Sequence, residues 1–148
     1  MTTVPEIREL AAQPTVVTVA VTDAAGLPAV VDSGFPRLFG RLAELGVAPA
    51  GAPYIRYLRV GDELELELGI PVPAGTQGAD GALPAGRVAV LRHVGHFSGL
   101  REAGEGLERW VAEQGEEVAG PFWEAYVTDP ASEPDSSKWI TAICLPVR

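Results

Sequence analysis

The chain has 148 residues, of which 47% are hydrophobic, so it is long and apolar enough to fold as one globular domain. Its 20 acidic and 11 basic residues give a formal net charge of −9 without any run of Lys and Arg, which argues against direct nucleic-acid binding. The single cysteine, Cys144, excludes an internal disulfide and a cysteine-based zinc site. No signal segment or membrane-spanning run occurs, so we expect a cytoplasmic protein without membrane contacts.

The first half of the chain predicts the order strand, helix, strand, strand. These elements are a strand over residues 15–22, a helix over 35–46 and strands over 54–60 and 63–70. Pro36 suits the first turn of the helix and Gly46 suits its end. In the last strand, acids at 63, 65 and 67 alternate with leucines and predict a solvated face that discourages edge pairing.

The second half repeats this order after a Gly- and Pro-rich loop over residues 71–86. Its elements are a strand over residues 87–94, a helix over 98–115 with Ser98 as N-cap, and strands over 122–129 and 138–147. The halves also end alike, with "IPV" at 70–72 and "LPV" at 145–147. This pattern indicates an internal duplication.

The duplication predicts an α+β fold and a single domain over 1–148, with internal halves at about 1–73 and 87–148. The β-α-β-β units are expected to form an antiparallel sheet with pseudo-twofold symmetry and both helices on one face. A cleft between the halves is then the expected position of a ligand.

The stretch "PFWEAYVTDP", residues 121–130, places one acid among aromatic residues. Side chains alternate along a strand, so Phe122, Glu124 and Tyr126 share one face, whereas Trp123 points away and is expected to pack in the core. Burial of a carboxylate is costly unless it is hydrogen-bonded, protonated or matched by a cation. Glu124 is therefore either a satisfied structural acid or part of a binding site.

A family resemblance rests on five segments taken in order: "GAPYIRY" (51–57), "GIPVP" (69–73), "HVGHF" (93–97), "WEAYVTDP" (123–130) and "KWITAICLPV" (138–147). Together they resemble the GyrI-like effector-binding family over nearly the whole chain. The resemblance implies a duplicated strand-helix-strand-strand fold. It also implies binding of bulky, often cationic and aromatic, small molecules, by the sensing half of a transcription activator or by a stand-alone protein.

The resemblance also implies site residues. The family's buried glutamate, which meets the ligand's positive charge, matches Glu124, and aromatic positions match Trp139, Tyr57 and Phe97. Phe97 lacks the hydroxyl of the tyrosine that often occupies this position, so its side chain supplies no O–H group for a hydrogen bond there.

Two further aromatic residues are candidates from the strand and helix patterns. Tyr126 shares a strand face with Glu124. Trp110 lies on the apolar stripe of a helix that is expected to border the cleft.

We therefore expect a binding protein for bulky apolar or cationic aromatic molecules, and a regulatory role is left open. One alternative is a hydrolase that opens the cyclopropane ring of alkylating natural products, with Glu124 as general base and Tyr126 or Tyr57 as hydrogen-bond donor. A second alternative is a gyrase-inhibitor-type protein that binds another protein through its acidic surface. No cofactor is expected, a homodimer is left open, and His93 and His96 are expected on opposite strand faces, which argues against a metal site.

Overall fold

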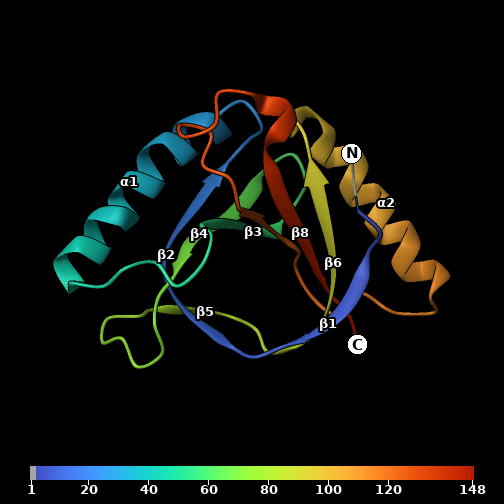
Figure 1. Cartoon of the computed structure of the whole chain (residues 1–148), viewed down its shortest axis with the longest axis horizontal. Coiled ribbons are helices and arrows are strands. Elements are labelled where there is room, and N and C mark those ends of the chain that lie inside the picture. The colour runs from blue at the N-terminus through green and yellow to red at the C-terminus, as the bar shows by residue number, and fades with distance from the viewer. Residues whose placement is uncertain (1–2) are drawn as a thin grey trace. The chain divides into compact units, whose positions relative to one another are not determined.

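The computed structural model describes residues 3–148, which form two compact units. The N-terminal unit is residues Ala11–Ala85. The C-terminal unit is residues Gly86–Arg148 together with the segment that ends at Leu10. Each unit is an antiparallel sheet with one helix against it (Figure 1), so the α+β prediction is confirmed.

The N-terminal unit contains β2 (Gln13–Thr22), α1 (Leu27–Leu45), β3 (Tyr54–Arg59), β4 (Leu64–Pro71) and β5 (Gly81–Leu83). Its strands lie in the order β3-β4-β2-β5. The buried face of α1 packs on β2 and β4. Gly34 permits this close approach, because a Cβ atom there would lie 2.7 Å from the Leu68 side chain.

Helix α1 begins eight residues earlier than predicted, at Leu27 rather than at residue 35. The Asp23 carboxylate accepts a hydrogen bond of 2.8 Å from the Gly26 backbone N–H, and Pro28 occupies the first turn. Pro36 therefore lies inside the helix, where the sequence pattern had suggested a start. The predicted end is confirmed, because Gly46 adopts the left-handed conformation with φ of 70°.

The acidic residues of β4 do not line a sheet edge, contrary to the prediction. This strand pairs with β3 on one side and with β2 on the other. Glu67 is half-buried and hydrogen-bonds the Tyr54 hydroxyl at 3.1 Å. Tyr54 is fully buried, also bonds the Thr15 hydroxyl at 3.1 Å, and has a pKa raised chiefly by burial.

The C-terminal unit contains β1 (Glu6–Leu10), β6 (Gly86–Val94), the 3-10 turn η1 (Phe97–Gly99), α2 (Leu100–Glu113), β7 (Trp123–Tyr126), the 3-10 turn η2 (Ser136–Lys138) and β8 (Ile140–Pro146). Its strands lie in the order β1-β6-β8-β7. Ser98 was predicted to cap α2, but the N-cap residue of this helix is Gly99. Instead Nδ1 of His96 accepts a hydrogen bond of 3.0 Å from the Ser98 backbone N–H and caps η1.

The two units share one topology, as the duplication predicts. In each, the chain runs strand, helix, strand, strand. The last strand lies in the middle of the three, between the strand before it and the strand that precedes the helix, which gives β3-β4-β2 in one unit and β7-β8-β6 in the other. An additional edge strand pairs with the first strand, β5 with β2 and β1 with β6. The expected halves place residues 6–10 with the first half, whereas their pairing with β6 places them in the C-terminal unit.

The core of the C-terminal unit lies between α2 and one face of its sheet. Its buried residues are Ala89, Leu91, Leu100, Leu107, Val111, Ile143, Leu145 and Val147. Cys144 lies on the opposite face of β8, and burial raises the pKa of its thiol to about 12, which is typical of an unreactive buried thiol. Within residues 3–148, no helix is both long and apolar enough to cross a membrane.

The ring of Tyr54 packs directly over Gly69. The two residues are paired across β3 and β4, and a Cβ atom at Gly69 would lie 2.3 Å from the Tyr54 ring. Because that ring is fully buried and hydrogen-bonded, we expect Gly69→Ala to lower the free energy of unfolding by about 1–3 kcal/mol, the usual cost of overpacking. Urea unfolding followed by circular dichroism measures this change.

Gly40→Ala is the matched control, since Gly40 lies in α1 and a Cβ atom there meets nothing within 4 Å. It should raise stability by about 1 kcal/mol through helix propensity. A Gly69→Ala variant as stable as the unaltered protein would contradict the described packing.

Candidate functional site

The register of β8 determines which side chains face α2. Ile143 belongs to the core beneath α2, and directly opposite it on β7 lies Glu124. Thr141, two residues earlier, lies opposite Tyr126 on β7 and opposite His93 on β6. Opposed residues of an antiparallel pair point to the same face, so these polar side chains all lie on the α2 side of the sheet.

Glu124 is a buried acid with a hydrogen-bond partner on its own strand. It is 9% exposed, and the Tyr126 hydroxyl donates a hydrogen bond of 3.0 Å to its Oε1 atom. The alternation read from the sequence places these two side chains on one face, and the register agrees. The contact holds the carboxylate in place and offsets part of the cost of its burial.

Aromatic rings gather beside this pair. Phe97 meets Tyr126 edge to face, with ring centroids 5.8 Å apart at 70°, and lies 4.8 Å from the Trp139 ring. His96 stacks on Trp139 at 5.6 Å and 24°, and its ring centroid also lies 6.2 Å from that of Phe97. The rings of Tyr126, Phe97, Trp139 and His96 therefore form one continuous cluster, which we call the aromatic cluster.

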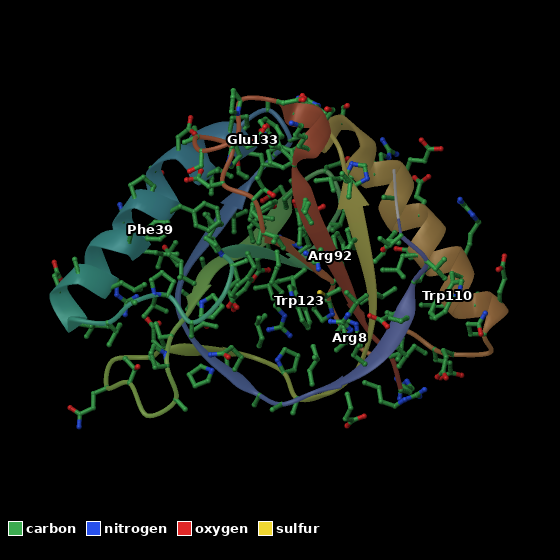
Figure 2. All side chains as sticks on the ribbon, viewed as in Figure 1. Arg8, Phe39, Arg92, Trp110, Trp123 and Glu133 are labelled. Atoms are coloured by element: carbon green, nitrogen blue, oxygen red, sulfur yellow. The ribbon has the colours of Figure 1, made fainter. Side chains whose placement is uncertain are left out.

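Local backbone features position the aromatic cluster. Gly95 has φ of 140°, which favours glycine, and ends β6 so that η1 brings Phe97 back toward the sheet. Trp139 follows η2, which Asp135 caps by accepting from the Ser137 backbone N–H. The indole N–H of Trp139 donates a 2.8 Å hydrogen bond to the carbonyl of Glu133. Glu133 lies in the connection between β7 and β8 (Figure 2).

Two further polar groups share this face and were not predicted as site residues. His93 is 8% exposed and Thr141 is fully buried. Among the described residues, neither Nδ1 of His93 nor Oγ1 of Thr141 has a hydrogen-bond partner. Strand alternation could have placed His93 on this face. It follows Leu91 by two residues, so both side chains point to the same side of β6, and Leu91 lies in the core beneath α2.

The structure thus brings four of the six predicted site residues together. These are Phe97, Glu124, Tyr126 and Trp139 of the C-terminal unit. Trp110 points from α2 (Figure 2) and packs against the core cluster. Tyr57 lies in the N-terminal unit, opposite Leu66 on β4. Trp123 is buried opposite Cys144, on the other face from Glu124, as expected.

The chemistry available here is that of one buried acid next to polarisable rings. A carboxylate in a low-dielectric setting attracts a cation more strongly than one in water, and ring faces add cation–π attraction. No group of three or more His, Cys, Asp or Glu side chains placed to hold a metal ion occurs among residues 3–148.

Comparison with solved structures shows the same fold in several proteins. The EcmrR C-terminal domain matches with a TM-score of 0.82 at 18% identity, covering 97% of this chain and 96% of that one. SAV2435 bound to tetraphenylphosphonium matches with a TM-score of 0.67 at 15% identity, covering 99% and 94%. A hydrolase from Listeria innocua matches with a TM-score of 0.69 at 13% identity, covering 97% and 91%.

The chain spans 57% of the longer EcmrR chain in its complex with DNA, where the TM-score is 0.80 and the identity 18%. No curated protein matches the sequence. The model of the GyrI-like small molecule binding domain matches residues 5–148, nearly the whole chain. The protein therefore belongs to the GyrI-like small molecule binding domain family.

Proposed function

We propose that the protein binds bulky, cationic aromatic small molecules, and that the carboxylate of Glu124 meets the ligand's positive charge. The observation that carries this proposal is the placement of a 9% exposed carboxylate beside the aromatic cluster. Tyr126 joins the two, since its hydroxyl bonds Glu124 and its ring contacts Phe97. A cation at this place would offset the cost of the buried negative charge.

Three further observations support a cationic ligand. The family is one of small-molecule binding domains. Tetraphenylphosphonium, the ligand of the similar protein SAV2435, is a bulky aromatic cation. The net charge of −9 also attracts cations through the long-range field. The likeness to EcmrR favours a regulatory use of this binding, in which the domain senses an effector.

The test compares tetraphenylphosphonium with triphenylphosphine oxide, a neutral molecule that carries three of the same rings. We expect Glu124→Gln to weaken binding of the cation about tenfold or more, because a contact with a buried charge contributes roughly 1.5–3 kcal/mol. Binding of the neutral probe should change much less. Isothermal titration calorimetry at one ionic strength measures both affinities.

Glu113→Gln is the matched control, because it removes the same charge from an exposed position on α2. It should reduce cation affinity only slightly, by the change in long-range field. If Glu124→Gln lowers the affinity for both probes equally, Glu124 does not distinguish a charged ligand from a neutral one. Absence of saturable binding of either probe to the unaltered protein would refute the proposed function itself.

The hydrogen bond from Tyr126 to Glu124 favours a second candidate function, the hydrolysis of a strained cyclopropane. Glu124 would take a proton from water as the water oxygen attacks a ring carbon. The breaking C–C bond would send its electron pair to a conjugated carbonyl oxygen, and the proton held by Glu124 would then pass through Tyr126 to that oxygen. The net reaction adds one water across the ring. The hydrolase from Listeria innocua has the same fold.

Turnover separates the two functions. A binder should return a cyclopropane-bearing alkylator unchanged beyond the uncatalysed rate, as liquid chromatography with mass spectrometry would show. A hydrolase should give many ring-opened products per protein molecule, and Tyr126→Phe should lower kcat by about 10²-fold or more, the scale of general acid–base catalysis. We expect the first outcome, since Phe97 supplies no hydroxyl to the site. Multiple turnover would overturn that expectation.

A further inference from the structure

His96 connects the aromatic cluster to the turn that carries Phe97. Its Nδ1 atom accepts a hydrogen bond of 3.0 Å from the Ser98 backbone N–H and lies 3.1 Å from the Ser98 hydroxyl oxygen. Its backbone carbonyl accepts a 3.1 Å bond from the Gly99 backbone N–H, and the same oxygen lies 3.1 Å from Nε2 of His93. The side chain and the backbone of His96 therefore both hold η1 in place, and with it Phe97.

The hydrogen bond from Ser98 fixes the protonation state of the His96 ring in this arrangement. A backbone N–H only donates, so Nδ1 is unprotonated and the proton of the neutral ring lies on Nε2. Protonation would turn Nδ1 from an acceptor into a donor, which breaks this bond and leaves a positive charge on the ring. Histidine is the side chain that ordinarily undergoes this change between about pH 5 and 8.

A positive charge on His96 would lie next to a cation held by the aromatic cluster. The His96 ring stacks on Trp139 at 5.6 Å and lies 6.2 Å from the Phe97 ring. A cation in contact with those two rings would lie roughly 7 Å from the charge, where repulsion near a protein surface corresponds to about a fivefold loss of affinity. The imidazolium would also compete with the ligand for the cation–π attraction of Trp139.

The segments next to His96 carry several charged or titratable groups. These are His93 on β6, Arg101 and Glu102 in the first turn of α2, Glu124 on β7, Glu133 before η2, and Asp135 and Lys138 in η2. Within residues 3–148, none of the carboxylates forms an ion pair with His96. No acid partner therefore stabilises the protonated ring or cancels its charge.

We propose that neutral His96 is a positioning residue of the cation site, and that its protonation weakens the binding of cationic ligands. This inference rests on the function proposed above and adds its regulation by pH. By linkage, a bound cation disfavours the protonated ring by the same factor by which the protonated ring disfavours the cation. Cation affinity therefore rises with pH through the titration of His96, and a bound cation moves this titration to lower pH.

The first measurement follows the two histidine rings of the protein by NMR. Protein with ¹⁵N-labelled histidine is titrated between about pH 8 and about pH 5, alone and with saturating tetraphenylphosphonium, whose charge does not depend on pH. His96→Asn removes one set of ring signals and so assigns that set to His96. We expect the cation to lower the midpoint of the His96 titration by about 0.7 pH unit, which corresponds to a fivefold change. Triphenylphosphine oxide, which is neutral, should move it much less.

The second measurement follows affinity by isothermal titration calorimetry over the same pH range. His96→Asn keeps a side-chain oxygen that can cap η1 and removes the titrating ring. Between about pH 8 and about pH 5, the affinity for tetraphenylphosphonium should fall about fivefold less in this variant than in the unaltered protein. Protonation of Glu124 would weaken cation binding in both proteins, so the difference between them isolates His96.

Two results would overturn the inference. The first is a midpoint of the His96 titration that stays unchanged or rises when the cation is bound. The second is the same dependence of affinity on pH in His96→Asn and in the unaltered protein. Failure of the proposed function has a different sign, the absence of saturable tetraphenylphosphonium binding at about pH 8, and it would overturn both proposals.

Discussion

The pairing of β8 with β6 on one side and β7 on the other is the constraint on which the site depends. It places Glu124 opposite Ile143 and aligns His93, Thr141 and Tyr126 in one row across three strands. A shift of one residue would turn all of these side chains to the other face of the sheet. The apolar residues that share their face fix this register, because Leu91, Ile143 and Leu145 must meet α2.

The two units differ at one pair of equivalent positions, Ile55 and Glu124. Ile55 lies opposite Leu68 in the N-terminal unit, as Glu124 lies opposite Ile143 in the C-terminal unit. Two residues later, each strand carries a tyrosine, Tyr57 or Tyr126. An apolar residue that is 2% exposed in one unit is thus replaced by a buried acid in the other. Burial of a glutamate lowers stability, whereas burial of an isoleucine does not. The glutamate at this position therefore favours a binding role for Glu124.

The sequence predicted the elements better than their ends and contacts. Alternation in β7 and the order of strands and helices were enough to place Glu124 beside Tyr126 and to identify the duplication. The start of α1 was misplaced, since Pro36 resembles a first-turn proline although Pro28 holds that position. Strand β5 was read as loop because three residues, one of them Gly81, carry no periodic signal. The unpartnered atoms of His93 and Thr141 emerge only from three-dimensional packing, which no spacing rule encodes.

The proposed function depends on a contact between the Glu124 carboxylate and the charged centre of a ligand held against the aromatic cluster. A crystal structure of the protein with tetraphenylphosphonium would reveal whether this contact forms. We expect the phosphorus centre to lie beside the Glu124 carboxylate, with phenyl rings against Phe97 and Trp139. Clear density for the cation at another place, with no ligand atom in contact with the Glu124 carboxylate, would refute this proposal.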